Sequence, residues 1–303
     1  MQVIRNIKNY RLNSTCYKTV TIGNFDGLHK GHISIIDKLV SEAQEKKGDS
    51  ILITFDPHPA EILVNNFKIE LIQTQKQFCS NLDSQKVSTL IIEKFTNDYS
   101  KLTAEQFFNR IYRKLKFDKL LIGYDFKFGK DKLGDFNFLY EKSVEHKFAI
   151  EKIEPFKLDD TVVSSTRIRD LLRDGNISEA NNFLGRKYCV TGKVIKGAGK
   201  GVEIGFPTMN LESDNMLFLK HGVYETNVTI EGEVYKSITN FGQAPTLNNQ
   251  RKPILEVHLL SENKDCYGLA VGLEFCKFIR PEMKFSGIDE LKGQIQKDIN
   301  SIK

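Results

Sequence analysis

The chain has 303 residues, of which 40% are hydrophobic and 27% are charged, and it carries a formal net charge of +5. This length predicts one or two domains, and the composition is ordinary for a soluble globular protein. Lysines interleaved with acidic residues give no support to a nucleic-acid partner, and anionic small molecules such as nucleotides fit the charge equally well.

The cysteine pattern and the apolar segments indicate the cellular compartment in which the protein is expected. The five cysteines are odd in number, and no pair has CxxC spacing. A disulfide framework or a zinc knuckle is therefore not indicated, and a reducing cytoplasm fits best. The N-terminus lacks the pattern of a signal peptide, and no apolar run approaches the ~20 residues of a membrane helix. We expect a cytoplasmic protein with no membrane partner.

The first half of the chain alternates between short apolar runs and helical patterns. We predict strands at 18–23, 50–55, 88–93, 119–124 and 149–153. One amphipathic helix is predicted after the first strand, and another begins at the capping-box pattern TAEQ (103–106). Strands that alternate with helices indicate an α/β domain, with a parallel sheet covered on both faces.

The pattern changes from Tyr188 onward. Residues 222–230 and 233–241 alternate in polarity around a Glu231-Gly232 turn, and 254–260 and 267–279 are further predicted strands. A last helix is predicted at 288–299. These elements indicate an all-β barrel or sandwich with a closing helix. Gly185 suits a helix C-terminus, so we place the domains at 1–184 and 185–303.

Four polar clusters follow the strands of the first half. They are GNFDGLHKGH (23–32), DPHP (56–59), GYDFKFGK (123–130) and VVSSTRIRDLL (162–172). Ligands of open parallel sheets bind beyond the carboxyl ends of the strands. We therefore expect one crevice to collect all four clusters.

His29 and His32 admit three interpretations: metal ligands, a catalytic base with a helper, or a cradle for an anion. Zinc is disfavoured, because two ligands are too few and the HExxH spacing is absent. Gly31 permits close backbone approach, and a helix N-terminus offers N–H groups and a positive dipole end. We favour phosphate binding over a structural role.

The SSTRIR cluster has a structural and a functional interpretation. Ser164 or Ser165 would cap the following helix in any protein. Arg167 and Arg169, however, are cations in the first turn, where they oppose the helix dipole. A bound polyphosphate would explain them, although one of the two arginines can still be simple surface. DPHP alone is consistent with a rigid turn, and GYDFKFG fits either core packing or a planar heteroaromatic ligand.

In the second half, the segment KGAGKGVEIGFPTMNL (196–211) is the most informative. Gly201 stands where a Walker A loop requires Ser or Thr, so that loop is excluded. The glycines describe either a loop that closes over phosphates or a flexible hairpin tip. Thr208 and Asn210 carry hard oxygen ligands suited to Mg²⁺.

These motifs resemble a known family. GNFDGLHKGH, TFDPHP, GYDFKFG and SSTRIR, in this order and spacing, resemble the adenylyltransferase half of the prokaryotic bifunctional riboflavin kinase/FMN adenylyltransferase (FAD synthetase) family. GFPTMN, HGVY, TNFGQAPT, LEVHLL and FIRPEMKF resemble its riboflavin kinase half. The resemblance covers nearly the whole chain. It implies a Rossmann-like nucleotidyltransferase domain, then a six-stranded antiparallel barrel with a C-terminal helix.

The resemblance also implies an activity and a set of site residues. Riboflavin and ATP would give FMN, and FMN and ATP would give FAD and pyrophosphate, with Mg²⁺ as cofactor. The implied catalytic residues are His29, His32, Arg169 and Glu256, and the implied metal ligands are Thr208 and Asn210. The implied ATP-binding residues are Gly23, Phe25, Asp26, Gly31, Ser164, Thr166, Gly197, Gly199 and Gly201. The implied flavin-binding residues are Asp56, His58, Asp125, Phe126, Phe128, Arg280 and Phe285.

Some positions depart from the family pattern. Lys132 stands where an arginine is common, Val202-Glu203 and Ala244 replace basic residues, and SENKD (261–265) replaces an Asp-Phe turn. Glu256 shares a strand face with His258, which suits either a general base or a solvent-facing residue. Two alternatives therefore remain: an FAD synthetase with an inactive flavin-binding barrel, and a non-catalytic flavin- or nucleotide-binding regulator. We expect a monomer or a weak homo-oligomer.

Overall fold

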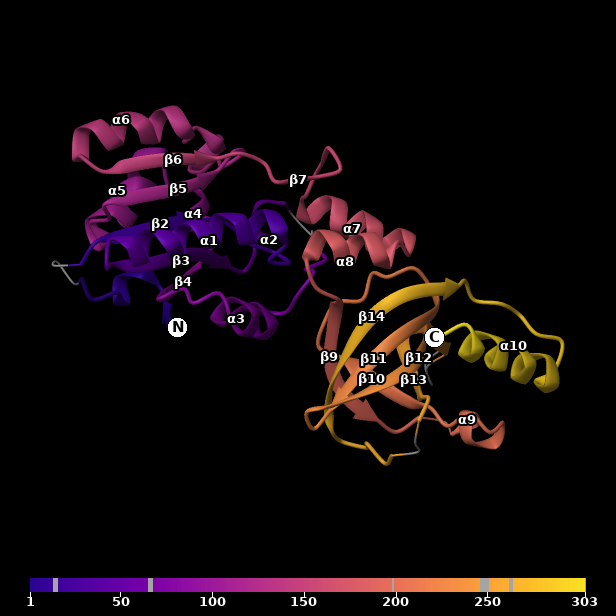
Figure 1. Ribbon diagram of the computed structural model, residues 1–303. Coiled ribbons are helices and arrows are strands. Elements are labelled where there is room, and N and C mark those ends of the chain that lie inside the picture. The colour runs from indigo at the N-terminus through magenta and orange to yellow at the C-terminus, as the bar shows by residue number, and fades with distance from the viewer. Residues whose placement is uncertain (13–15, 65–67, 198, 246–250, 262–263, 303) are drawn as a thin grey trace. The chain divides into compact units, whose positions relative to one another are not determined.

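The computed structural model describes residues 1–12, 16–64, 68–197, 199–245, 251–261 and 264–302. They form two compact units (Figure 1). Unit 1 comprises Met1–Ile69 and Gln75–Val163, and unit 2 comprises Glu70–Thr74 and Ser164–Lys303. Part of the SENKD turn (residues 262 and 263) and the end of TNFGQAPT lie outside the described residues.

Unit 1 is built on a six-stranded parallel sheet with the order β1-β4-β3-β2-β5-β6. Its strands are β1 (Gln2–Arg5), β2 (Lys18–Ile22), β3 (Asp49–Asp56), β4 (Thr89–Lys94), β5 (Lys119–Gly123) and β6 (Ala149–Ile153). The five strands predicted from apolar runs are confirmed. The edge strand β1 was not predicted, because its four residues are mostly exposed and carry no apolar run.

Helices cover both faces of this sheet, as predicted. On one face, α1 (Lys30–Glu45) and α3 (Gln75–Asp83) pack on Leu52 and Leu90. On the other face, α5 (Ala104–Leu115) and α6 (Phe136–His146) pack on Val20 and Ile51. The predicted capping box of α5 is present, since the side chains and backbone amides of Thr103 and Gln106 bond reciprocally.

Short elements complete unit 1. They are the single turns η1 (Ile7–Asn9), α2 (Pro59–Leu63), α4 (Asn97–Ser100) and η2 (Lys130–Lys132), and the two-residue strands β7 (Lys157–Leu158) and β8 (Thr161–Val162).

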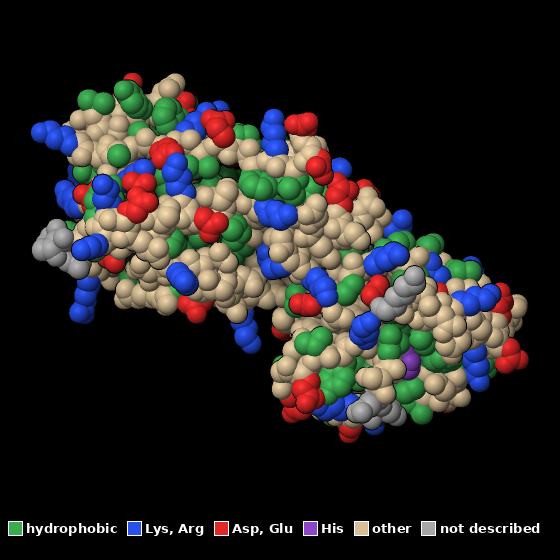
Figure 2. All heavy atoms as spheres, viewed as in Figure 1, with side chains coloured by type: hydrophobic (Ala, Val, Ile, Leu, Met, Phe, Trp, Pro, Cys, Tyr) green, Lys and Arg blue, Asp and Glu red, His purple; other side chains and the backbone are tan. Residues whose placement is uncertain are grey.

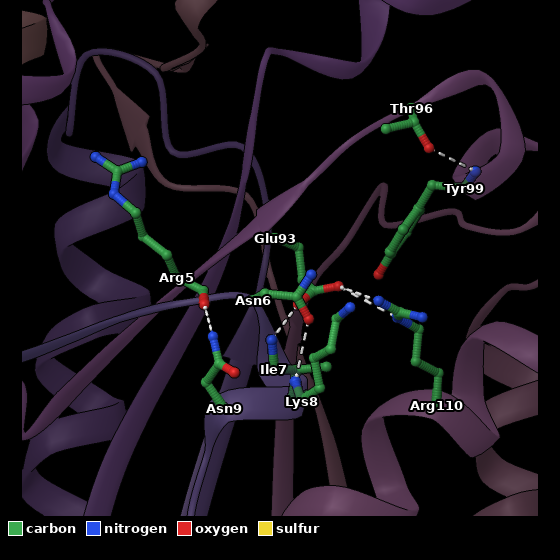
Figure 3. A network of polar contacts seen from close by, with 9 residues as sticks. All are labelled: Arg5, Asn6, Ile7, Lys8, Asn9, Glu93, Thr96, Tyr99 and Arg110. Atoms are coloured by element: carbon green, nitrogen blue, oxygen red, sulfur yellow. Dashed lines mark hydrogen bonds and ion pairs between the residues drawn. The ribbon is translucent and has the colours of Figure 1, made fainter.

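A buried carboxylate attaches the N-terminal strand to the sheet (Figure 3). Glu93 of β4 is fully buried, and it accepts hydrogen bonds from the backbone N–H of Ile7 and from Arg110 Nε and Nη2 at 3.2 and 3.1 Å. The Arg110 guanidinium lies 5.2 Å from the centroid of the Tyr99 ring. A buried charge is tolerated only when it is paired and hydrogen-bonded. Glu93 therefore fixes the segment after β1 to the interior of unit 1.

Lysines follow the ends of the long helices of unit 1. Lys116 and Lys147 are the C-caps of α5 and α6, with φ of 48° and 59°. Lys47 and Lys86, beyond the ends of α1 and α3, also have positive φ, at 52° and 61°. This conformation costs an L-residue roughly 1–2 kcal/mol, whereas the positive charge favours a helix C-terminus.

Unit 2 contains the predicted antiparallel barrel, and the barrel is closed. Its order is β10-β13-β12-β11-β14-β9, around a core that includes Tyr224, Phe241 and Phe275. The strands are β9 (Tyr188–Ile195), β10 (Met209–Ser213), β11 (Gly222–Ile230), β12 (Glu233–Pro245), β13 (Arg251–Leu259) and β14 (Ala270–Arg280). One helical turn, α9 (Lys200–Glu203), lies in the glycine-rich loop, and α10 (Ile288–Asn300) is the predicted closing helix.

Two further helices, α7 (Ser165–Asp174) and α8 (Ile177–Leu184), belong to unit 2. Asn181 of α8 donates to the carbonyl of Phe275 at 2.8 Å, and its Oδ1 accepts from the backbone N–H of Tyr188 at 2.7 Å. A Cβ on Gly175, which ends α7, would approach Lys220 and Phe278 at 3.1 and 3.3 Å. These contacts attach the helix pair to the barrel.

Positive and negative side chains are interspersed on the face shown in Figure 2. Within the described ranges, every helix is too short or too polar to cross a membrane. The five cysteines form no disulfide with any described residue.

Candidate active sites

The turn between β2 and α1 contains two non-glycine residues with positive φ, Phe25 and Leu28. Phe25, Gly27 and Leu28 have φ of 52°, 84° and 40°. Phe25 and Leu28 are nearly fully buried, at 3% and 1% exposure, so core packing holds these two residues in a region that L-residues avoid. Asp26 is buried in the same turn. A Cβ on Gly23 would lie 3.1 Å from the Phe25 ring, so the glycine accommodates that aromatic side chain.

The two histidines of this turn form a stacked pair. Their ring centroids are 3.6 Å apart and the rings are inclined by 15°. His29 is the N-cap of α1, and its Nδ1 accepts the backbone N–H of His32 at 3.2 Å. Because Nδ1 accepts, the hydrogen of a neutral His29 ring is on Nε2. The Phe25 ring meets the His32 ring edge-on at 5.3 Å.

Gly31 leaves room for the His29 ring. A Cβ at Gly31 would lie 3.2 Å from both Nδ1 and Cε1 of His29, and 3.5 Å from the carbonyl oxygen of Val163. The sequence suggested close approach of the backbone to a ligand. The structure adds a different reason: the imidazole itself folds over the first turn of the helix.

DPHP forms a turn in unit 1, with its polar side chains engaged. Asp56 accepts a hydrogen bond from Gln75 Nε2 at 3.0 Å and lies 3.9 Å from Arg5 Nη1. His58 is the N-cap of α2, where its Nδ1 accepts the N–H of Ala60 at 3.2 Å. The Asp56-Pro57 peptide bond is cis.

GYDFKFG divides into a core residue and surface residues. Phe128 is buried, its ring lies 4.8 Å from that of Phe107, and a Cβ at Gly134 would approach it at 2.6 Å. Phe126 is half-buried and stacks on Phe128 at 5.5 Å, whereas Asp125 is exposed. Core packing therefore accounts for Phe128, while Phe126 and Asp125 reach the surface.

SSTRIR lies in unit 2, where Ser164 caps α7 by accepting the N–H of Arg167 at 3.3 Å. Arg167 pairs with Glu179 at 3.7 Å, and Arg169 Nε donates to the backbone carbonyl of Glu70 at 2.7 Å. Thr166 is exposed. The described partners of the two arginines are protein groups of unit 2. The crevice expected to combine this motif with His29 and His32 stays a prediction.

In the barrel, three polar residues form a row across adjacent strands. Glu256 of β13 is paired with Asn210 of β10 on one side and with Asn240 of β12 on the other. Leu255 and Val257 are buried in the barrel core, whereas Glu256 is half-buried. Because side chains alternate along a strand, Glu256 points away from the core, toward the outer face of the barrel.

Asn240 was missed as a site residue. Its Nδ2 donates to Glu256 Oε2 at 3.3 Å. The carboxylate only accepts, so this orientation of the amide is required. The available signal was a polar residue in TNFGQAPT between Thr239 and Phe241, which are both buried.

The glycine-rich loop packs on the two residues proposed for Mg²⁺. A Cβ on Gly197 would lie 2.5 Å from Asn210 Nδ2, and a Cβ on Gly201 would lie 2.9 Å from Thr208 Oγ1. Gly199 has φ of 74° and open space around it. The described residues contain no group of three His, Cys, Asp or Glu side chains that could hold a metal. Hydroxyl and amide oxygens next to a phosphate-bearing ligand still suit Mg²⁺.

Arg280 binds within the protein. Its Nε and Nη2 lie 2.9 and 2.8 Å from Asp298 Oδ2, a residue of α10 with 3% exposure. Its Nη1 donates to the carbonyl of Pro281 at 3.0 Å, and the Phe285 ring lies 5.8 Å away. Arg280 thus attaches α10 to the barrel, a role that sequence reasoning did not foresee.

Comparison with known proteins identifies the family to which each half of the chain is similar. The FAD synthetase family model matches residues 12–167, and the riboflavin kinase model matches residues 184–303. A bifunctional riboflavin kinase/FMN adenylyltransferase of Haemophilus influenzae is 35% identical, over 100% of this chain and 98% of the relative.

The chain belongs to the bifunctional riboflavin kinase/FMN adenylyltransferase family.

As a member of this family it is an enzyme with both activities. The Bacillus subtilis relative of the same name is 33% identical, over 92% of this chain and 89% of the relative. A crystal structure described as a macrolide-efflux protein from Streptococcus pneumoniae shares the fold, with a TM-score of 0.90 and 27% identity, covering 99% of this chain and 98% of that one. The two family models and both relatives agree on flavin chemistry, and the functional assignment rests on them.

Proposed function

We propose that the two reactions use separate sets of residues. His29, His32 and the SSTRIR motif serve FMN adenylyltransferase. Glu256, Thr208 and Asn210 serve riboflavin kinase. The observation that carries the kinase assignment is the row Asn210–Glu256–Asn240, with Gly197 and Gly201 against the metal-binding side chains.

In the adenylyltransferase reaction, an oxygen of the FMN phosphate attacks the α-phosphorus of ATP, and pyrophosphate leaves. His29 Nε2–H and His32 donate to the phosphates at the positive end of α1. Ser164, Thr166 and Arg169 hold the β- and γ-phosphates. No covalent enzyme intermediate is needed, because positioning and charge stabilisation lower the barrier. Mg²⁺, when bound with ATP, supplies further charge neutralisation.

In the kinase reaction, Glu256 takes the proton of the riboflavin 5′-hydroxyl. The riboflavin 5′-oxygen attacks the γ-phosphorus of ATP at the same time, and ADP leaves. Asn240 holds Oε2 of Glu256, which directs Oε1 to the hydroxyl. Thr208 and Asn210 would hold Mg²⁺ against the phosphates, and Gly197, Gly199 and Gly201 would let the loop close over them.

The flavin contacts are proposed at two places. Asp56, His58, Asp125 and Phe126 would contact FMN in the adenylyltransferase half, with Phe128 acting through its stacking on Phe126. In the kinase half, Phe285 would contact riboflavin, and Arg280 would act by holding α10 and Phe285 in place.

We also propose a functional boundary at 184/185, Mg²⁺ as cofactor, a cytoplasmic location, and a monomer or weak homo-oligomer without nucleic-acid or membrane partners. The riboflavin kinase model begins at residue 184, and this supports the boundary. The positive and negative side chains interspersed on the face shown in Figure 2 support the absence of a nucleic-acid partner on that face.

Two single substitutions test the separation of the sites. His29→Ala should abolish FAD formation from FMN and leave FMN formation from riboflavin intact, and Glu256→Gln should do the reverse. Chromatographic resolution of the flavins formed with MgATP measures both. Loss of both activities in each variant would contradict the two-site proposal. A wild-type protein that forms FAD but no FMN would favour the inactive-barrel alternative, and flavin binding without turnover would favour the regulator.

A further inference from the structure

His258 connects β13, the strand that carries Glu256, to residues 207–210, the segment that carries the proposed Mg²⁺ ligands Thr208 and Asn210. It follows Glu256 by two residues on β13, so both side chains lie on the outer face of the barrel. His258 Nδ1 lies 2.8 Å from the carbonyl oxygen of Pro207. A carbonyl oxygen only accepts, so Nδ1 carries the hydrogen and the imidazole donates to Pro207.

The position of Pro207 makes this bond important for Thr208. Strand β10 begins at Met209, so the ladder with β13 fixes Asn210 opposite Glu256. Thr208 precedes the ladder and is not held by it. The Phe206 N–H donates to the carbonyl of Gly201 at 2.8 Å, and His258 holds the carbonyl of the following residue, Pro207. The peptide that leads into Thr208 is therefore fixed by His258.

The Phe206 ring adds to this contact. It meets the His258 ring edge-on, with centroids 5.7 Å apart and the planes inclined by 78°. The imidazole is thus held on one side by its carbonyl partner and on another by an aromatic ring.

We propose that His258 is a positioning residue of the riboflavin kinase reaction. By fixing the Pro207 carbonyl, it sets the Thr208 hydroxyl relative to Asn210 and Glu256. The inference rests on the proposed assignment of Thr208 and Asn210 to Mg²⁺. Groups that orient metal ligands typically change metal affinity by about 10- to 100-fold when they are removed.

The test uses three substitutions in the full chain. His258→Asn places an amide nitrogen close to the position of Nδ1, so it can still donate to Pro207. His258→Gln places its amide near Nε2, and His258→Phe has no donor. Leu255 and Val257 of the same strand fill the core, so all three variants should keep the barrel.

Two measurements follow these variants. The Mg²⁺ concentration for half-maximal riboflavin kinase activity should rise about tenfold or more in His258→Gln and His258→Phe, and stay within about threefold in His258→Asn. FMN adenylyltransferase activity of the same preparations should be unchanged, and it serves as the internal control. Hydrogen exchange of the peptide 201–209, without nucleotide or metal, should quicken in His258→Phe and not in His258→Asn.

Different results overturn different statements. A His258→Phe enzyme with wild-type Mg²⁺ dependence, or a His258→Asn enzyme as impaired as His258→Phe, would overturn the positioning role. Thr208→Ala and Glu256→Gln test the proposed function itself. If they keep wild-type kinase activity, the site assignment fails whatever the His258 variants do.

Discussion

Gly201→Ala gives a direct test of the contact between the glycine-rich loop and the PTMN segment. A Cβ at residue 201 would lie 2.4 Å from the carbonyl oxygen of Phe206 and 2.9 Å from Thr208 Oγ1. The first neighbour is backbone, so it cannot turn aside as a flexible side chain would. Either the loop or the segment that carries Thr208 has to move.

The size of the movement follows from the contact distance. Ordinary van der Waals contact of a Cβ begins at 3.4 Å, so relief of the 2.4 Å contact needs a shift of about 1 Å. A misplacement of about 1 Å at a reaction centre can cost about 100-fold in rate, or roughly 2.7 kcal/mol. We expect riboflavin kinase kcat to fall by about that factor.

The assay compares FMN formed from riboflavin with FAD formed from FMN in one preparation. FAD formation should be unchanged, because the adenylyltransferase site uses other residues. Gly232→Asn is the matched control: this hairpin-turn position has φ of 90° and open space around it, Asn tolerates positive φ, and the residue lies outside the proposed site. Kinase activity of Gly201→Ala within about threefold of wild type would refute the reasoning, as would an equal loss in Gly232→Asn.

Three further outcomes are expected. Asn240→Asp should lower riboflavin kinase kcat more than Asn240→Ala, by about tenfold or more, because a second carboxylate repels Glu256, and equal losses would contradict this. Lys147→Gly should be more stable to urea than Lys147→Ala by about 1 kcal/mol, since φ of 59° strains any residue with a Cβ. Hydrogen bonds from the backbone and side chain of Ser286 lower the pKa of Glu290 below 4.5, so its stabilisation is present above that pH and is lost as pH falls through the lowered value. The difference in Tm between wild type and Glu290→Gln should therefore be present at pH 7 and become smaller as the pH is lowered below the ordinary pKa of a glutamate.

Elements that bury an apolar run were predictable from the sequence, and an exposed edge strand was not. The run KLLIGY (119–124) predicted β5 to within one residue of its observed bounds, because Leu120, Leu121 and Ile122 are apolar and buried. In β1, Gln2–Arg5, the burial pattern is mostly exposed. Its place in the sheet depends on pairing with β4 and on the bond from Ile7 to buried Glu93, neither of which has a local signal.

The site residues divide in the same way. Glu256 and Asn210 were named from their motifs, and the barrel places them side by side. The bond of Arg280 to Asp298 joins residues 18 positions apart, and that of Arg169 to Glu70 joins residues 99 positions apart. The chemistry of an arginine does not reveal whether its partner is a substrate or the protein. Spatial pairing decides this, and a single sequence does not contain it.

Unit 2 is formed by two separate segments of the chain, and this affects whether the chain could be divided into two genes. Residues 70–74 belong to unit 2, yet they are encoded within unit 1. Arg173 and Arg169 bond to Glu70, and Arg186 donates to Gln73 at 3.1 Å. A fission at a single peptide bond between residues 74 and 164 would leave these arginines on one product and their partners on the other. Two separate genes for the two activities would therefore have to do without the bonds that residues 70–74 make to unit 2.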